Sequence, residues 1–131
     1  MASPDTNGRG ARDGAQDAVI DMQVIAGLRE LGGEDEPGLL VEIVALYLSD
    51  APRRLQEIDQ ALASGDLKAL ERAAHTLKSS SQNVGATGMA QLCRQMEELA
   101  RRSEVSGVRV LQDKGSRHWR EVERALRSLG A

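Results

Sequence analysis

The chain has 131 residues, a mass of 14.1 kDa and a formal net charge of −3 at pH 7. This length suits one domain, and 40% hydrophobic with 28% charged residues is the balance of a globular protein. Ala, Leu, Glu and Arg are plentiful while aromatic residues make up only 2%, which argues against an all-β fold. The weak acidity also argues against nucleic-acid binding, which needs a clustered basic surface.

The single cysteine excludes an internal disulfide and a cysteine-based zinc site. No segment reaches the ~18 to 20 apolar residues of a membrane span, and the N-terminus lacks the apolar stretch of a secretory signal. We therefore expect a cytoplasmic protein that does not insert into a membrane. Residues 1–17 contain no Leu, Ile or aromatic residue, so we expect a disordered tail or linker there and a folded domain over 18–131.

The first predicted element is a short helix. Apolar residues recur at helical spacing over 20–28, and the glycine pair at 32–33 is a typical C-terminal signal. The acidic residues that follow, together with Pro37, predict the start of a second helix. Pro52 is expected to break or kink that helix, with Asp50 capping a restarted segment that ends at 64–65.

The next two elements are long amphipathic helices joined at Gly85. Asp66 is the predicted N-cap of the third helix, and the apolar stripe of that helix consists of Leu67, Leu70, Ala74, Leu77, Ser81 and Val84. Thr87 is the predicted cap of the fourth helix, whose stripe consists of Met89, Leu92, Cys93, Met96, Leu99 and Ala100.

The last predicted element is a helix that carries Trp119, Val122, Leu126 and Leu129. Residues 103–115 are expected to be less regular because they contain Gly107 and Gly115. No repeat of fixed period is present. The elements together predict an all-α fold, an antiparallel four-helix bundle with a short additional N-terminal helix.

His75, in the third helix, is the residue of greatest chemical interest. At about 100° per residue, it lies roughly 140° from the centre of the apolar stripe, so it is a surface histidine and not a core one. The simplest alternative is an ordinary exposed histidine. However, Lys78, Ser79 and Gln82 lie within about 60° of it on the same face. An imidazole that is partly neutral near pH 7, beside an ammonium group and small residues, suits a nucleophile that receives an anion.

The segment from His75 to Ala86 reads His-Thr-Leu-Lys-Ser-Ser-Ser-Gln-Asn-Val-Gly-Ala. It resembles the phosphorylation motif of histidine-containing phosphotransfer (HPt) domains of bacterial phosphorelays, His-x-Leu-Lys-Gly-x-x-x-x-x-Gly-Ala. The match is specific over 73–86 and looser over about 20–129. The resemblance implies a core of four antiparallel helices. Ser79 departs from the family pattern, which often has a Gly that lets a receiver domain approach closely; Ser is the next smallest polar residue, so we expect access to be kept.

The resemblance implies that Nε2 of His75 takes a phosphoryl group from a phospho-aspartate of one receiver domain and hands it to another. Lys78 would then stabilise the phosphoryl oxygens, and Gln82 would either donate to the group or face water. The proton on Nδ1 needs an acceptor. Glu97 is our candidate, because it lies 22 residues after the histidine, where family members carry Gln or Glu. An ion pair between Glu97 and Arg101 at i,i+4 is the equal alternative, and Arg101 would add positive potential.

Four residues around the histidine are predicted to form the docking surface for a partner: Thr76, Ser79, Asn83 and Gly85. Gly85 also ends the third helix in either interpretation. The expected partners are receiver domains of response regulators or of a hybrid histidine kinase, and we expect a monomer. No cofactor is expected in this chain, because Mg²⁺ would belong to the receiver domain. No metal site is expected either, since His118 is read as a boundary residue and Cys93 as a small core residue.

Two other classes of function stay open from the sequence. One is a non-catalytic helical-bundle adaptor that binds signalling partners, although the chain keeps both His75 and Lys78. The other is an enzyme that uses His75 as general base, but no Ser or Cys nucleophile with an acidic partner is evident, since the serines at 79–81 lie along the same helix. The sequence also contains no P-loop pattern and no ATP-binding motif, so we expect a phosphocarrier and not a kinase or another enzyme.

Overall fold

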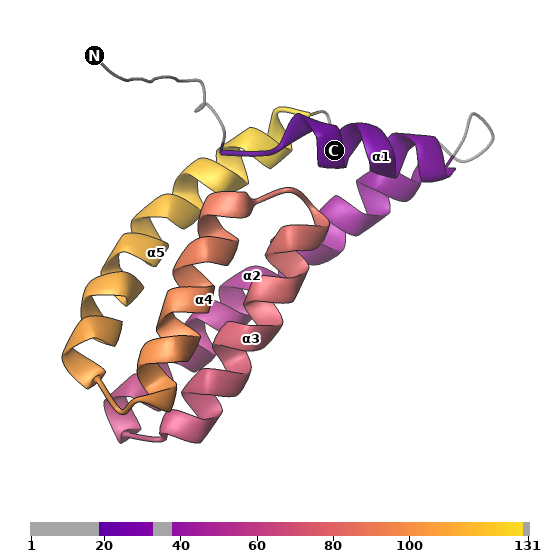
Figure 1. Cartoon of the computed structure of the whole chain (residues 1–131). Helices are drawn as coiled ribbons and strands as arrows, with labels where there is room; N and C mark the ends of the chain where they lie inside the picture. The colour runs from indigo at the N-terminus through magenta and orange to yellow at the C-terminus, as the bar shows by residue number, and fades with distance from the viewer. Residues whose placement is uncertain (1–18, 33–37, 130–131) are drawn as a thin grey trace, which may run out of the picture.

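The computed structural model describes residues 19–32 and 38–129, which form five α-helices and no strand. The helices are α1 (Met22–Gly32), α2 (Gly38–Ser64), α3 (Leu67–Asn83), α4 (Thr87–Arg101) and α5 (Val105–Arg127). The last four run alternately up and down, each packs against the next, and α2 also packs against α5 (Figure 1). The predicted all-α bundle with a short leading helix is confirmed. None of the described helices is long and apolar enough to cross a membrane.

Helix α1 lies across one end of the bundle, next to the connection between α3 and α4 (Figure 1). Its position agrees with the predicted first helix. The start signal expected at 34–37 and the expected tail at 1–17 lie outside the described residues.

Helix α2 is continuous, so the predicted break at Pro52 is wrong. A proline inside a helix removes one backbone donor, but α2 is buried on both sides of it, at Tyr47, Ala51 and Ile58. Packing of this apolar face therefore maintains the helix through the proline. Asp50 caps no restarted helix, and its carboxylate instead accepts a hydrogen bond from Nε of Arg54 at 3.1 Å.

The predicted cap of α3 is confirmed, whereas that of α4 is wrong. The carboxylate of Asp66 accepts a hydrogen bond from the backbone N–H of Ala69 at 3.1 Å. Thr87 is the first residue of α4 itself, and the preceding Ala86 provides no side-chain cap. The chain enters α4 directly from a tight turn at Gly85, which fixes the start of the helix without a capping side chain.

Residues 103–115, predicted to be irregular, lie mostly within α5, which begins at Val105. Both glycines that suggested irregularity face α4, and Gly107 packs closely on it. A Cβ at Gly107 would lie 2.8 Å from Cδ1 of Leu99, and Gly115 is buried near Met96. Burial of the apolar face of α5 outweighs the low helix propensity of glycine at these positions.

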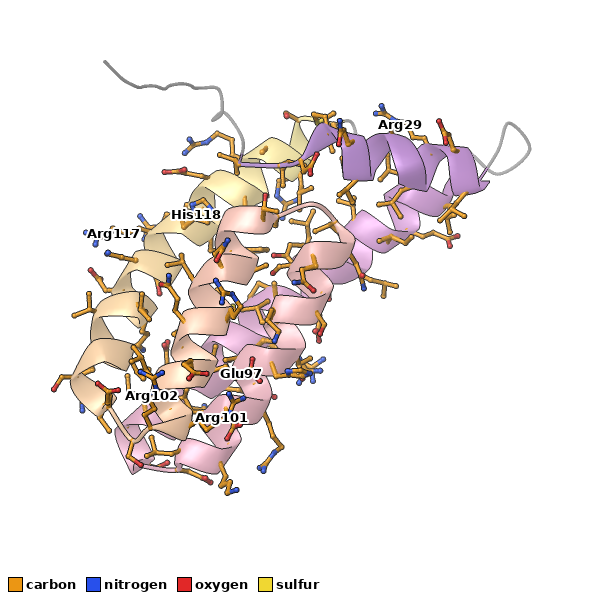
Figure 2. All side chains as sticks on the ribbon, in the orientation of Figure 1. Arg29, Glu97, Arg101, Arg102, Arg117 and His118 are labelled. Carbon is orange, nitrogen blue, oxygen red and sulfur yellow. The ribbon has the colours of Figure 1, made fainter. Side chains whose placement is uncertain are left out.

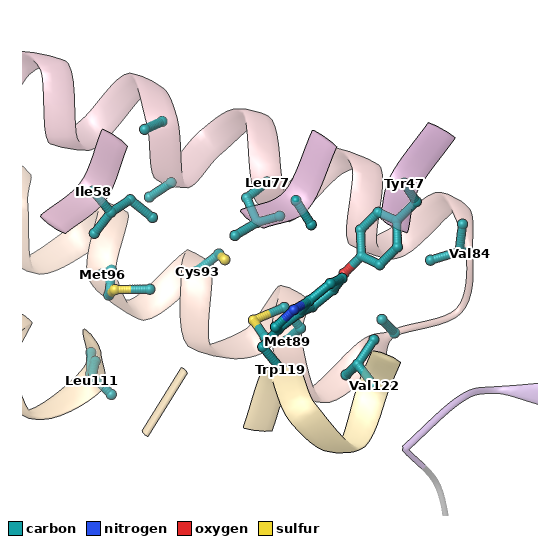
Figure 3. Packing of buried hydrophobic residues seen from close by; sticks show 14 of the residues in the cluster. Tyr47, Ile58, Leu77, Val84, Met89, Cys93, Met96, Leu111, Trp119 and Val122 are labelled. Atoms are coloured by element: carbon teal, nitrogen blue, oxygen red, sulfur yellow. The ribbon is translucent and has the colours of Figure 1, made fainter. Parts of the chain in front are cut away.

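The core lies between the four long helices (Figure 3). A buried polar pair, Tyr47 and Ser81, adjoins it. The hydroxyls of Tyr47 and Ser81 are 2.7 Å apart and joined by a hydrogen bond that links α2 to α3. The ring of Tyr47 also packs edge-on against Trp119, with ring centroids 5.5 Å apart. Burial raises the pKa of Tyr47, so the residue stays neutral. The bond joins the buried face of α3 to α2, while His75 lies on the exposed face of α3.

Gly85 forms the turn between α3 and α4 in a conformation that other residues rarely adopt. Its φ is +76°, and its carbonyl accepts a hydrogen bond from the backbone N–H of Asp21 at 2.7 Å. A Cβ at this position would lie 2.8 Å from the carbonyl oxygen of Asp21 and 3.1 Å from Cβ of Val24. The glycine therefore both turns the chain and lets α1 rest on the end of the bundle.

Replacing Gly85 with Ala should destabilise the protein more than the same change at Gly65. Both glycines have positive φ, +76° and +77°, but nothing lies within 4 Å of a Cβ at Gly65. Gly65→Ala should cost about 1 to 2 kcal/mol, the penalty of the left-handed conformation. Gly85→Ala should cost about 1 to 3 kcal/mol more, because the backbone of Asp21 must move. Urea unfolding followed by circular dichroism measures both, and equal losses would contradict the packing role of Gly85.

Candidate functional site

His75 lies on the exposed face of α3, as predicted, and faces a carboxylate from α4. Its side chain is 58% exposed. Nδ1 of the ring is 2.9 Å from Oε2 of Glu97. Glu97 therefore faces the histidine and is also paired with Arg101, so both predicted contacts of the carboxylate are present together.

Glu97 is the centre of a network of ion pairs between α3 and α4. Nζ of Lys78 donates to its Oε1 at 2.9 Å, and Nη2 of Arg101 donates to its Oε2 at 3.2 Å. Nε of Arg101 in turn donates to Oε2 of Glu71 at 3.1 Å. We call these five residues, including His75, the carboxylate network. Figure 2 shows Glu97 and Arg101 in the half of α4 that leads to α5.

The carboxyl group of Glu97 is held in its ionised form. Its side chain is only 10% exposed, and this burial raises its pKa. The hydrogen bonds and charges of Lys78 and His75 act in the opposite direction and prevail, so the pKa of Glu97 lies below its ordinary value. The network therefore contributes stability at neutral pH, and that contribution is lost as the pH falls through the lowered pKa.

The ionised carboxylate determines which nitrogen of His75 carries the proton. An ionised carboxylate only accepts hydrogen bonds, so the 2.9 Å contact requires a proton on Nδ1 of His75. In the neutral ring the lone pair is then on Nε2, and more than half of the side chain is exposed. The site thus presents Nε2 as the nucleophile, and Glu97 on the neighbouring helix sets the tautomer of the imidazole ring.

The remaining predicted site residues are divided between the surface and the interior. Thr76, Ser79, Gln82 and Asn83 are exposed along α3, and Gln82 is not part of the carboxylate network. Gly85 is buried beneath α1, so it offers no surface to a docking partner.

Glu71 is a member of the network that the sequence reasoning missed. It precedes His75 by one helical turn and lies on the same face of α3, a spacing that is visible in the sequence. Together with Arg72, His75, Thr76 and Glu97 it lines an open pocket of about 320 Å³ beside the imidazole.

Neither the other histidine nor the cysteine belongs to the carboxylate network. His118 is on α5, with Nδ1 3.7 Å from Oε1 of Glu121. Cys93 is fully buried in the core, where burial raises the pKa of its thiol to about 12. Within 19–32 and 38–129, no group of three or more His, Cys, Asp or Glu side chains is placed to hold a metal ion.

Comparison with known proteins places this geometry in a family. The family model described as "Hpt domain" matches residues 42–130, which include α3, α4 and the whole carboxylate network. The chain belongs to the Hpt domain family.

Relatives from a plant, a fungus and a bacterium agree with this membership. Histidine-containing phosphotransfer protein 4 of Arabidopsis thaliana is 33% identical over 94 residues, which cover 70% of this chain and 74% of that protein. Multistep phosphorelay regulator 1 of Schizosaccharomyces pombe is 31% identical over 93 residues, which cover 71% of this chain and 32% of the regulator. The crystal structure of histidine-containing phosphotransfer protein B from Pseudomonas aeruginosa has a TM-score of 0.77 and 32% identity, over 84% of this chain and 92% of that one.

Membership of the Hpt domain family associates the chain with phosphotransfer in phosphorelay signalling. The sequence resemblance and the bundle fold both led to this family, and the comparisons confirm it.

Proposed function

We propose that this Hpt domain is a phosphocarrier in which Nε2 of His75 relays a phosphoryl group between aspartates of receiver domains. One observation carries the proposal: the imidazole is exposed while its Nδ1 is held 2.9 Å from a buried, ionised carboxylate. This arrangement leaves Nε2 as the nucleophile. The chain would then be a carrier and not an enzyme in its own right.

The transfer is a substitution at phosphorus. The lone pair of Nε2 forms the new N–P bond while the P–O bond to the aspartyl oxygen breaks, and the electron pair leaves with the aspartate carboxylate. The ring becomes a phosphoimidazolium that keeps its proton on Nδ1. Glu97 accepts that proton in a hydrogen bond and balances the positive charge of the ring. Because these interactions act equally in reverse, the same site supports onward transfer.

Lys78 would neutralise the phosphoryl oxygens. It lies one turn after His75, and its ammonium group has three donors, of which one is 2.9 Å from Glu97. Gln82, two turns after the histidine and exposed, is a weaker candidate for a contact with the same group.

The partner would supply the rest of the chemistry. A receiver domain brings the phospho-aspartate and the Mg²⁺ that stabilises the phosphoryl group, so this chain needs no cofactor of its own. The exposed side chains of Thr76, Ser79 and Asn83 surround the histidine face and would contact the receiver.

A transfer assay tests the proposal directly. Incubated with a phosphorylated receiver domain and Mg²⁺, the protein should become labelled, and the label should be labile in acid and stable in alkali, as a phosphoramidate is. A second, unphosphorylated receiver should then remove it. A chain that binds receivers in a titration but takes up no phosphate from them would be the non-catalytic adaptor instead.

A further inference from the structure

Lys78 is already engaged with Glu97 in the structure, although the proposed function requires it near the phosphoryl group. Its Nζ is 2.9 Å from Oε1 of the carboxylate, and its side chain is only 20% exposed. A phosphoryl group on Nε2 of His75 would add a second centre of negative charge within one turn of α3. The two anions would then compete for one ammonium group.

Arg101 is also bound to Glu97, but in a different way. Each of its three nitrogens is paired with a carboxylate: Nε with Glu71 at 3.1 Å, Nη2 with Glu97 at 3.2 Å and Nη1 with Glu98 at 3.0 Å. Turning this guanidinium toward a phosphoryl group would break three contacts. Turning Lys78 would break one.

We propose that Arg101 is a positioning residue that holds Glu97 against Nδ1 of His75 while Lys78 turns to the phosphoryl group. This inference rests on the proposed function, because it assigns a division of labour to two cations in the same site. Arg101 keeps the buried carboxylate compensated, so Lys78 can leave without exposing Glu97 as an unpaired charge. No bond is made or broken in this step, and only ion pairs are exchanged.

The placement of Arg101 suits this role. It is the last residue of α4, one turn after Glu97, where a cation also interacts favourably with the helix dipole. Its bond to Glu71 ties it across to α3, one turn before His75. The guanidinium therefore bridges the two helices beside Nδ1 of His75. Its planar, rigid set of donors suits this role better than a flexible ammonium group.

The test compares two neighbouring arginines at the end of α4. Arg101→Gln removes the proposed positioning residue. Arg102→Gln is the matched control, because Arg102 pairs with Glu98 at 3.1 Å and Glu104 at 4.0 Å and does not bind Glu97. The proteins are phosphorylated with phosphoramidate, a small donor that releases ammonia and needs no receiver domain.

The first measurement is the ¹⁵N signal of the Lys78 ammonium group by NMR, before and after phosphorylation. In the unaltered protein and in Arg102→Gln, the signal should change when His75 is phosphorylated. In Arg101→Gln the change should be much smaller, because Glu97 retains the ammonium group. Adding Glu97→Gln to Arg101→Gln should restore it, because a neutral amide does not compete for Lys78. A merely structural role of Arg101 does not predict this rescue.

The second measurement is the lifetime of the phosphohistidine. Arg101→Gln should shorten it by roughly two- to fivefold, on the scale of one exposed ion pair, and Arg102→Gln should not. The inference is overturned if the Lys78 signal responds fully in Arg101→Gln, or if Glu97→Gln brings no rescue. Because phosphoramidate replaces the receiver, these outcomes are distinct from failure of the proposed function, which is refusal of phosphate from a phosphorylated receiver by the unaltered protein.

Discussion

A His75→Gln variant should take up no acid-labile phosphate from a phosphorylated receiver. Glutamine keeps a polar side chain of similar reach but has no nucleophilic lone pair comparable to that of Nε2, so no N–P bond forms. The fold should survive, because the side chain is 58% exposed and no core packing depends on it. Labelling with a radioactive receiver and circular dichroism measure the two effects.

His118→Gln is the matched control for this experiment. His118 is the only other histidine, and it lies on α5, which packs against α4 and α2. Its side chain is 23% exposed, compared with 58% for His75. The control should be labelled like the unaltered protein. Label that persists in His75→Gln, or that disappears in His118→Gln, would show that the wrong histidine has been assigned.

The features predicted correctly are those that depend on one helix at a time. The exposure of His75, the cap at Asp66 and the apolar stripes follow from a 3.6-residue period and from local capping chemistry. The contact between His75 and Glu97 joins two helices, and its prediction needed the resemblance to a family.

The errors in the fold share a physical cause, which is that tertiary packing outweighed a local signal. Pro52 and the two glycines of α5 each lower the helix propensity, yet α2 and α5 run through them because their apolar faces are buried on the bundle. Thr87 has the chemistry of a cap, but the turn at Gly85 already determines where α4 begins. Such effects depend on neighbours that are distant in sequence.

The charged part of the site was predicted only in part, for a related reason. The i,i+4 pair of Glu97 and Arg101 is visible in the sequence, and so is the position of Glu71 one turn before His75. That Arg101 reaches across to Glu71 depends on the packing of α4 on α3, which brings residues 30 positions apart to within 3.1 Å. The sequence identifies which charges are available, and the helix packing decides which of them meet.

A groove near the C-terminal end of α3 supports a second prediction, which concerns receiver docking. Leu46 lies on α2, on the side of α3 opposite the carboxylate network, and is 70% exposed. Leu46 lines a groove of about 350 Å³ between α2 and α3, together with Ile43 and Asn83. An apolar groove next to a polar, small-residue face is suited to a partner that must bring its aspartate to within about 3 to 3.5 Å of Nε2. Ser79, exposed on α3, lies on this face one turn after His75.

Ser79→Trp should therefore block receiver binding and transfer while leaving helix content and thermal stability nearly unchanged, since an exposed site has no core to overpack. Titration with a receiver measures affinity, and circular dichroism measures the fold. Ser116→Trp, the same change on the exposed face of α5, is the matched control and should bind normally.

Labelling by phosphoramidate should also persist in Ser79→Trp, because a small donor still reaches Nε2. If that labelling is lost too, the indole covers the imidazole and the effect is not one of docking. If binding and transfer are both normal, the receiver approaches from another face, and the surface assigned along α3 and α2 is wrong.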